Sequence, residues 1–362
     1  MDLAVLRRAF LLSALLPTAA FGSGFPQYWN VNEAHDPDVD VTLYGFRPRN
    51  FTQVGDGCSQ PASMNCSSWL QGLWPEIKSS GEKINGGVPQ AGNLSLHLEA
   101  IEKTLPGWIP DPEWAGNAVL DFESWTTVWE QNIGEGDWHS KRYQNESLRL
   151  ANGNETAAKT QFEDSATRWF VETLVLCRKL RPNAKWGFYG LPLNAMNGCQ
   201  NVTNKKGAPK SCGYLGKDSE ADELRRAAEL TQLPIWRAST AMFPSIYLAT
   251  PFRNHPVSVA EAYIDSTVSE SVKVAALAAS IDGLESPIPV FPYAWDHFHA
   301  GKHLLPKESL VASMQVSKQA GASGVVWWGN DRVAGNATYW TWFKSTEGPI
   351  VEAFCNSLPN GC

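Results

Sequence analysis

Short apolar segments alternate with longer segments of helical periodicity along most of this 362-residue chain. Segments with the length and composition of buried strands are Gln27–Val31, Asp40–Phe46, Ala118–Trp125, Lys185–Leu191, Phe243–Ala249, Val290–Trp295 and Gly324–Trp328. Helical segments between them are Asn93–Thr104, Ala157–Leu180, Glu220–Leu230, Val257–Ala279 and Lys307–Gln319. Repeated strand–helix units predict parallel strands with right-handed crossovers, and seven or eight such units indicate an α/β barrel.

The strand predicted at Ala118–Trp125 carries two carboxylates near its end. Asp121 and Glu123 are two residues apart, so an extended chain points both to the same side. Two carboxylates this close do not both ionise cheaply, so one can hold a proton while its neighbour stays charged. This arrangement suits cleavage of a glycosidic bond, although an isolated Asp-x-Glu is usually only a solvated strand end.

Six segments of the sequence help to interpret the acid pair. In chain order they are FPQYWNV, GGVPQAGNLSLHLEAIEK, NAVLDFESW, WGFYGLP, FPSIYLA and GVVWWG. Together they resemble the hyaluronidase family of glycoside hydrolases over roughly residues 25 to 355. The resemblance implies a distorted (β/α) TIM-like barrel, here a single domain over residues 23–362. In that architecture functional residues gather at the carboxyl ends of the strands.

The resemblance also implies a reaction and its catalytic residues. Glu123 would protonate the leaving oxygen and later deprotonate water. The acetamido carbonyl of the sugar would attack its own anomeric carbon, with Asp121 orienting the acetamido N–H and Tyr247 holding the acetamido oxygen. This substrate-assisted route needs no protein nucleophile and no cofactor. The implied activity is endo-hydrolysis of hyaluronan, with chondroitin or another N-acetylhexosamine polymer as alternatives.

Further aromatic residues at predicted strand ends are candidate substrate contacts. By resemblance, Tyr189 contacts the sugar and Trp328 packs on it. Alternation along a strand places Trp327 and Trp328 on opposite faces, so only one of them can enter the cleft. Tyr293 and Trp295 end another predicted strand and are expected to line the same cleft.

The chain departs from the family pattern in two places that bear on substrate. Family members commonly carry Arg-Pro after the Glu-x-Trp triplet, whereas Thr126 and Thr127 follow here. After Leu191-Pro192 the chain continues with Leu193–Asn197, which lacks an aromatic residue that the family typically has there. The first change puts affinity for an anionic chain in doubt, and the second alters a wall of the cleft.

Three other functional classes fit the residues less well. A chitinase-like enzyme would need acids at the positions of Gly116 and Val119. A catalytically silent sugar-binding protein has no need to retain Asp121 and Glu123. A metal site at His297, His299 and His303 lacks an acidic or cysteine partner at fixed spacing beyond Asp296, so we expect a polar loop and no metal.

Net charge and composition limit the kinds of molecule that the protein is expected to bind. The formal net charge of −7 argues against a nucleic-acid-binding surface, so a basic groove for an anionic polysaccharide would have to be local. Sixteen tryptophans are consistent with sugar-stacking faces and also with a large aromatic core. We expect a monomer. Candidate basic positions are Lys205, Lys206, Lys210, Lys217, Arg225 and Arg226.

The N-terminal residues and the cysteines predict an oxidising compartment. Residues 1–22 have the basic start, apolar run and small-residue cleavage site of a signal peptide, and no later segment reads as a membrane anchor, so we expect a secreted or lumenal protein. Close spacing favours the disulfides Cys58–Cys66, Cys199–Cys212 and Cys355–Cys362, leaving Cys177 as a buried free thiol on the Ala157–Leu180 helix. Both cysteines of the family's long-range disulfide are missing. Glycosylation acceptors would be Asn50, Asn65, Asn93, Asn145, Asn154, Asn201 and Asn336.

Overall fold

The computed structural model describes residues 24–30, 39–47, 51–55, 73–137, 139–192, 232–299, 303–329 and 336–362. Its contacts divide the chain into two compact units. Unit 1 comprises Met1–Phe51, Tyr189–Glu223 and Ala241–Cys362, and unit 2 comprises Thr52–Phe188 and Leu224–Thr240. The predicted signal peptide, the helix at Glu220–Leu230 and all six candidate basic residues lie outside the described residues.

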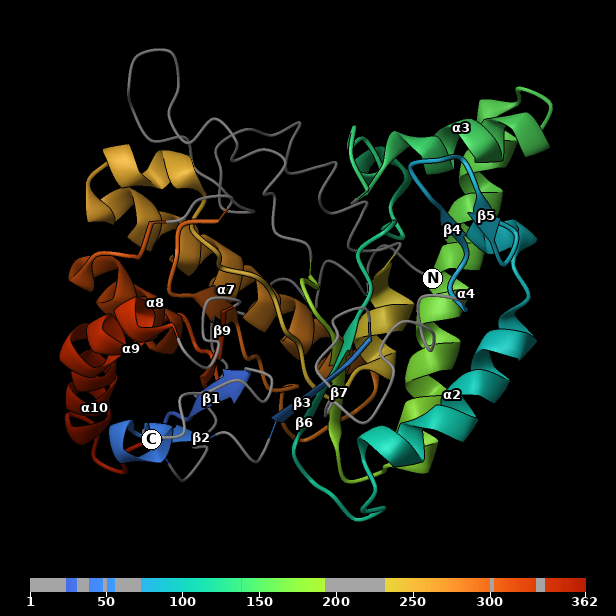
Figure 1. Ribbon diagram of the computed structural model, residues 1–362. Coiled ribbons are helices and arrows are strands. Elements are labelled where there is room, and N and C mark those ends of the chain that lie inside the picture. The colour runs from blue at the N-terminus through green and yellow to red at the C-terminus, as the bar shows by residue number, and fades with distance from the viewer. Residues whose placement is uncertain are drawn as a thin grey trace. The chain divides into compact units, whose positions relative to one another are not determined.

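Unit 1 contains a four-stranded sheet in the order β2-β1-β9-β8, with every neighbouring pair parallel. Strands β1, β2 and β9 of this sheet are labelled in Figure 1. Its strands are β1 (Gln27–Asn30), β2 (Phe46–Arg47), β8 (Tyr293–Trp295) and β9 (Val325–Trp328). The predicted strand Phe243–Ala249 lies beside β8 but pairs only through isolated parallel bridges, such as Ser245 with Tyr293. Pro244 and Pro292 have no N–H to donate, which interrupts a continuous ladder there.

Helices pack on the unit 1 sheet around one apolar core. They are α7 (Val257–Ile281), α8 (Lys307–Gln319), α9 (Ala337–Trp342), the π-helical turn η6 (Phe343–Glu347) and α10 (Gly348–Asn356), with the short 3-10 turns η2 (Val41–Tyr44) and η5 (Thr250–Asn254). The core joins strand residues such as Trp29 and Val325 to helix residues such as Ile264, Leu310 and Phe343. Residues Lys307–Gln319 form the predicted helix with the predicted bounds.

The predicted strand Asp40–Phe46 is wrong, because local capping folds most of it into η2. The Asp40 carboxylate accepts hydrogen bonds from the Thr42 backbone N–H at 3.0 Å and from the Thr42 hydroxyl at 2.6 Å. Gly45 then ends the turn with a left-handed φ of 87°. Only Phe46 of the predicted segment enters the sheet.

Unit 2 contains a three-stranded sheet in the order β3-β6-β7 and an antiparallel hairpin. The sheet strands are β3 (Phe51–Gly55), β6 (Asn117–Asp121) and β7 (Lys185–Phe188), and the hairpin pairs β4 (Glu76–Ile77) with β5 (Lys83–Ile84). β6 and β7 run parallel with Asn117 opposite Lys185 and Leu120 opposite Phe188, as strand–helix–strand repetition predicted.

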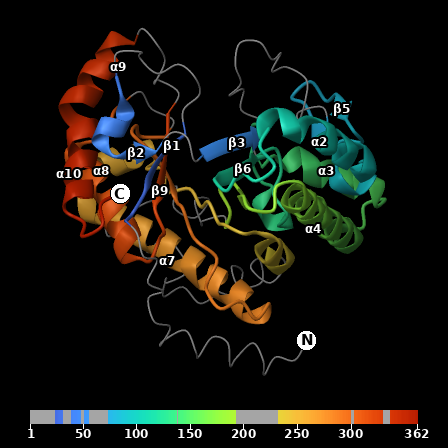
Figure 2. The ribbon, with the colours of Figure 1, turned by 90° about the horizontal axis from the view of Figure 1, so that it is seen from below.

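Helices α2 (Leu94–Trp108), α3 (Lys141–Leu150) and α4 (Glu155–Leu180) accompany the unit 2 sheet (Figure 2). The short 3-10 turn η3 (Pro89–Ala91) precedes α2, and η4 (Trp129–Gln131) lies between β6 and α3. α4 begins where the Asn154 side chain accepts the Ala157 N–H. Its predicted stripe is confirmed, because Phe162, Ala166, Trp169, Thr173 and Cys177 are buried and Leu180 is partly buried. The polar helix α3 was not predicted.

The centre of the unit 2 core is Trp74. Its ring stacks on Phe122 at 4.2 Å between centroids and contacts Trp125, Trp169 and Phe170 edge-on or tilted. Burying rings of this size supplies much of the hydrophobic free energy available to a unit with so small a sheet. Phe122 therefore anchors the chain directly after β6.

The described cysteines agree with the predictions made for them. Cys355 and Cys362 form a disulfide, and Cys177 is a buried free cysteine whose thiol pKa is raised by burial. Cys58, Cys66, Cys199 and Cys212 lie outside the described residues. Within the described ranges, no helix combines the length and apolar character that crossing a membrane requires.

Candidate active site

Strand β6 places the acid pair of unit 2. Asp121 is its last residue, and Phe122 turns into the core against Trp74. Phe122 is buried while Asp121 and Glu123 on either side of it remain partly accessible. The period-two alternation predicted from sequence therefore holds through Glu123, beyond the last ladder residue.

The chain around Glu123 is held on both sides by hydrogen bonds. The His139 N–H donates to the Glu123 carbonyl at 3.1 Å, and the Ser140 N–H donates to the Ser124 carbonyl at 3.4 Å. One residue further on, the Trp125 indole N–H donates to the Pro75 carbonyl at 2.7 Å. These bonds fix the main chain on both sides of Glu123.

A third acid, Glu76 on β4, lies next to this segment. The Ser124 hydroxyl donates to its carboxylate at 2.8 Å. Burial, aided by the negative charge of Glu76, raises the pKa of the neighbouring Tyr143 to about 12, against weaker opposing hydrogen bonds. Burial also lowers the pKa of His139 to about 4, so its imidazole is neutral near pH 7. His139 therefore brings no positive charge to the acid pair near pH 7.

Thr126 and Thr127, which replace the family's Arg-Pro, are both buried. The Thr126 N–H donates to the Asn132 side chain at 2.9 Å, and the Thr127 hydroxyl accepts from the Gln232 amide at 2.9 Å. They close the loop after the acids by hydrogen bonding. Neither side chain brings a positive charge to the site.

In unit 1, five predicted residues and His299 form one aromatic cluster, here called the aromatic wall: Tyr189, Tyr247, Tyr293, Trp295, Trp328 and His299. Trp295 lies 4.8 Å from Trp328 and 5.6 Å from Tyr247 between ring centroids. Tyr189 lies 4.9 Å from Tyr293 and 5.9 Å from Tyr247. His299 lies 6.0 Å from Tyr247, and burial lowers its pKa. Four parts of the chain, around residues 189, 247, 293–299 and 328, therefore bring these rings together.

Polar contacts hold the aromatic wall at its edges. The Asn30 amide donates to the Tyr293 hydroxyl at 3.2 Å, and the Tyr189 hydroxyl lies 3.5 Å from the Ser245 hydroxyl. Trp295 is only 9% exposed, and its indole N–H finds no hydrogen-bond acceptor among the described residues. A buried donor of this kind is costly unless an acceptor reaches it, which makes Trp295 a candidate ligand contact.

The two adjacent tryptophans of β9 separate as predicted. Trp327 is fully buried in the unit 1 core, where its indole N–H donates to Gln27 at 2.8 Å. Trp328 is partly exposed and lies 6.0 Å from Tyr247 in a stacked orientation. The roles assigned to these residues by resemblance remain predictions.

The predicted polar loop at His297 is in part a buried pair. His297 Nδ1 lies 2.5 Å from a carboxylate oxygen of Asp296. No group of three histidine, cysteine or acidic residues within the described ranges is arranged to hold a metal ion.

Sequence reasoning missed Glu76, Asn30 and Ser245. Each contacts a predicted site residue or its immediate neighbour from a distant part of the chain: Ser124 and Glu76 are 48 residues apart, and Asn30 and Tyr293 are 263 apart. No periodicity or motif in a single sequence indicates such pairs.

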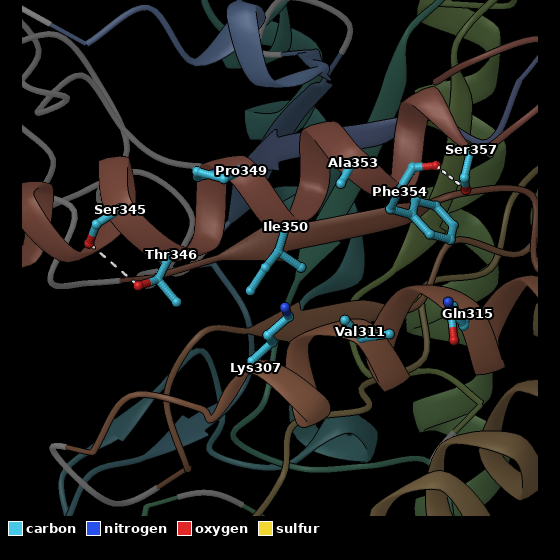
Figure 3. Close-up of a pocket in the computed structure, with 10 residues that line it drawn as sticks. All are labelled: Lys307, Val311, Gln315, Ser345, Thr346, Pro349, Ile350, Ala353, Phe354 and Ser357. Carbon is cyan, nitrogen blue, oxygen red and sulfur yellow. Dashed lines mark hydrogen bonds between the residues drawn. The ribbon is translucent and has the colours of Figure 1, made fainter.

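A cavity of about 540 Å³ lies away from these residues, between α8 and the C-terminal helices of unit 1 (Figure 3). Lys307 and Val311 of α8 line it on one side, and Ile350 and Phe354 of α10 on the other. It contains none of the predicted site residues, so the strand ends remain the candidate site.

Comparisons with known proteins agree with the geometry. Residues 51–345 match the family model described as Hyaluronidase. Hyaluronidase-1 of Bos taurus is 31% identical over 84% of this chain, and Hyaluronidase-1 of Homo sapiens is 30% identical over 84%. The matched region spans 64% of the bovine and 67% of the human protein, so the chain covers about two thirds of the length of these relatives.

A solved structure identifies the fold. Bee venom hyaluronidase matches with a TM-score of 0.71 at 22% identity, covering 91% of this chain and 99% of that chain. Bee venom hyaluronidase in complex with a hyaluronic acid tetramer matches with a TM-score of 0.70 at 22% identity, covering 91% and 98%. The predicted α/β fold class, a distorted TIM-like barrel, is confirmed.

Proposed function

The chain belongs to the hyaluronidase family, as its six sequence segments predicted, and from this premise we propose that it is a secreted endo-β-N-acetylhexosaminidase that hydrolyses hyaluronan. The observation that carries the proposal is the acid pair of β6: Asp121 and Glu123 lie on one side of the strand end, on a main chain fixed by hydrogen bonds. The hyaluronic acid tetramer bound by bee venom hyaluronidase supports the substrate class.

The proposed reaction has two steps. Glu123 donates a proton to the glycosidic oxygen while the substrate's own acetamido carbonyl oxygen bonds to the anomeric carbon and the leaving sugar departs. Asp121 accepts the acetamido N–H and stabilises the positive charge that develops there. Glu123, now ionised, takes a proton from water, whose oxygen attacks the anomeric carbon and releases the acetamido group. Configuration is retained because the anomeric carbon is inverted twice.

The aromatic wall supports the binding half of the proposal. Tyr247 would hold the acetamido oxygen through its hydroxyl, while Tyr189 and Trp328 contact the sugar rings. The unsatisfied indole N–H of Trp295 would donate to a sugar oxygen, which removes the cost of leaving that donor buried. Each role is assigned from the family resemblance, residue by residue.

A secreted or lumenal location belongs to the same proposal. The disulfide between Cys355 and Cys362 supports an oxidising compartment, where such bonds form and persist. The first-ranked substrate is hyaluronan and the second is chondroitin, since Thr126 and Thr127 supply no cation that would select for one anionic polymer.

The test is chain shortening of hyaluronan, chondroitin and chitin oligomers by secreted wild type, Glu123→Gln and the control Glu130→Gln. Glu130 is an exposed acid of unit 2 paired with Lys159, so its variant keeps wild-type activity. We expect wild type to cleave hyaluronan and Glu123→Gln to bind it without cleaving. Cleavage of chitin alone would mean that the substrate is chitin and not hyaluronan. Binding without cleavage by folded wild type would overturn the enzyme and leave a sugar-binding protein.

A further inference from the structure

A cavity of about 470 Å³ in unit 1 takes no part in the proposed reaction. It lies where η5 meets the first turns of α7 and α8, because Arg253 of η5, Val257 of α7 and Glu308 of α8 all line it. These elements follow the strand segments of unit 1 in the chain, so the cavity lies toward the carboxyl ends of those segments, the side on which barrel enzymes bind their substrates. We call this cavity the rim pocket.

One extended segment separates the rim pocket from the aromatic wall. Phe298 lines the pocket, and the next residue, His299, belongs to the wall. Successive side chains of an extended chain point to opposite sides, so the pocket and the wall lie on the two sides of this segment. The neighbouring segment is joined to it, since Ala249 pairs with His299 and the Thr250 hydroxyl donates to the His299 carbonyl at 2.9 Å. The rim pocket is therefore within reach of a polymer bound against the wall.

Arg253 brings a positive charge to the rim pocket. Its neighbour Phe252 is buried in the unit 1 core, with its ring centroid 5.2 Å from that of Tyr263, so the backbone that carries Arg253 is anchored. The Arg253 side chain is exposed and forms no hydrogen bond or ion pair with any described residue. A guanidinium group without a protein partner is suited to bind a carboxylate through two parallel hydrogen bonds.

Further polar groups line the rim pocket. Ser309 on α8 is only 6% exposed, yet its hydroxyl has no hydrogen-bond partner among the described residues. A nearly buried hydroxyl of this kind is costly unless a ligand or water reaches it. His255, which ends η5, carries at least one ring N–H in either protonation state, and the Glu308 carboxylate accepts hydrogen bonds. The pocket thus offers a cation, two donors and an acceptor to one ligand.

Apolar side chains such as Phe298 and Leu304 make up the rest of the lining. An apolar surface with a few polar groups around it is typical of small-ligand pockets, and the volume is in their usual range. A sugar acid matches this mixture, because its ring has an apolar face, its carboxylate suits Arg253 and its hydroxyl groups suit Ser309 and Glu308. A simple inorganic anion would gain nothing from the apolar lining and would be repelled by Glu308.

We propose that the rim pocket is a subsite for a uronic-acid residue of the polymer, at which Arg253 binds the sugar carboxylate and Ser309 binds a sugar hydroxyl. This inference rests on the proposed function, since it adds a contact to the same substrate. It supplies a positive charge that Thr126 and Thr127 do not bring to the acid pair. Hyaluronan and chondroitin carry a uronic acid in every disaccharide and chitin carries none, so the rim pocket favours the two anionic polymers equally over chitin.

The first experiment measures KM and kcat on hyaluronan for wild type, Arg253→Gln and Arg253→Lys. We expect Arg253→Gln to raise KM about 3- to 10-fold with kcat little changed, because one charge-assisted contact at a largely exposed site is lost. Arg253→Lys keeps the charge without the paired hydrogen bonds, so its KM should lie between those of the other two proteins. A wild-type KM in Arg253→Gln would overturn the subsite.

The matched control for charge is Lys318→Gln. Lys318 is exposed in the last turn of α8, at the opposite end of that helix from the rim pocket, and its side chain has no partner among the described residues. Its variant changes the net charge as Arg253→Gln does and should keep the wild-type KM. An equal rise of KM in both variants would mean that the overall charge of the protein, and not the rim pocket, attracts the polymer.

The second experiment measures binding by calorimetry in a Glu123→Gln background, with hyaluronan oligomers and with the same oligomers after methyl esterification of their carboxylates. Arg253→Gln should weaken binding of the charged oligomers about 3- to 10-fold and leave binding of the esters unchanged. Ser309→Ala should weaken binding of both about 2- to 5-fold, since a hydroxyl contact does not depend on the carboxylate. Equal weakening of both oligomers by Arg253→Gln would mean that this arginine supports the structure and does not bind the carboxylate.

The control for Ser309→Ala is Ser313→Ala, a buried serine of the same helix whose hydroxyl donates to the Ser309 carbonyl at 3.0 Å and should leave binding unchanged. Failure of this inference and failure of the proposed function give different results. Cleavage of hyaluronan by wild type and by Arg253→Gln with equal KM would overturn the subsite and leave the function intact. Binding without cleavage by wild type, weakened by Arg253→Gln for the charged oligomers alone, would overturn the function and support the subsite.

Discussion

The two units hold their candidate residues by different means. In unit 2 the segment carrying Asp121 and Glu123 is fixed through its main chain, by N–H groups of His139 and Ser140 that donate to carbonyl oxygens. In unit 1 the residues of the aromatic wall are fixed by ring contacts, and Asp296, directly after Trp295, is bonded to Tyr339 through buried side chains. The acids stay partly accessible, whereas Tyr247, Tyr293 and Trp295 are nearly enclosed.

This difference fits the roles proposed for each kind of residue. A general acid changes its protonation state twice in each turnover, so its carboxyl group must reach water and substrate while its backbone stays still. A sugar-stacking surface works through dry apolar faces, so packing is the natural way to fix it. We therefore expect substitutions in unit 2 to act on kcat and those in the wall to act on KM.

The largest effect should come from Glu123→Gln, which removes the transferable proton while keeping the shape of the side chain. We expect kcat to fall by about 10²–10⁴-fold with little change in affinity. Trp328→Ala should instead raise KM by about 10-fold, since an aromatic face contributes on the order of 1.5 kcal/mol. Steady-state release of reducing ends from hyaluronan oligomers measures both. A Trp328→Ala variant with normal KM and reduced kcat would contradict the expectation that substitutions in the wall act on KM.

The substitutions Trp74→Ala and Trp328→Ala should also differ in their effect on the free energy of unfolding, with the larger loss at Trp74. Trp74→Ala removes the ring at the centre of the unit 2 core, and we expect a loss of about 3–5 kcal/mol in the free energy of unfolding. Trp328→Ala, at a partly exposed ring, should cost about 1 kcal/mol. Urea unfolding followed by circular dichroism measures both losses. Equal losses would mean that Trp328 belongs to the core rather than to a binding surface.

Sequence patterns predicted those features that depend on neighbouring residues. The alternation of Asp121, Phe122 and Glu123 and the opposite faces of Trp327 and Trp328 follow from the two-residue period of a strand. The buried stripe of α4 follows from helical periodicity in the same way. These predictions needed no knowledge of the fold. The choice of family needed the whole ordered set of six segments.

Features that depend on distant partners or on local capping could not be predicted. Asp40 reads as the first residue of a strand until its carboxylate is seen to cap Thr42. Glu76 meets Ser124 only because β4 packs beside the end of β6, and Asp296 meets Tyr339 across 43 residues. Hydrophobic periodicity carries no information about such pairs.

Acid pH should lower the stability of unit 2, because Glu146 becomes protonated. Its hydrogen bond from Arg149 and its pairing with Lys83 outweigh desolvation and lower its pKa to about 2 from an ordinary value of 4.5. Because the folded pKa is the lower one, the stabilisation is complete above about pH 4.5 and disappears as pH falls toward 2. The shift sets an upper limit of about 3 kcal/mol, and since Arg149 is largely exposed we expect about 1–2 kcal/mol.

The variant Glu146→Gln tests this acid response. It should lower the free energy of unfolding by about 1–2 kcal/mol at pH 7 and by nothing measurable at pH 2. Glu135→Gln is the matched control, because its ion pair with Lys141 is exposed and should contribute little. A Glu146→Gln deficit that persists at pH 2 would point to lost packing instead of charge.

The smallest effect should come from Trp295→Phe, which tests whether the wall recognises sugar through more than its apolar faces. Phenylalanine keeps a ring against Tyr247 and Trp328 but removes the indole N–H that has no acceptor among the described residues. If that donor meets a sugar oxygen, KM should rise about 5- to 10-fold, the equivalent of one hydrogen bond. Stability should change little, because the smaller ring loses packing while a costly buried donor disappears. An unchanged KM would show that Trp295 binds through its face alone, and a Trp295→Phe protein with raised stability and raised KM would show that the buried N–H is kept for the ligand.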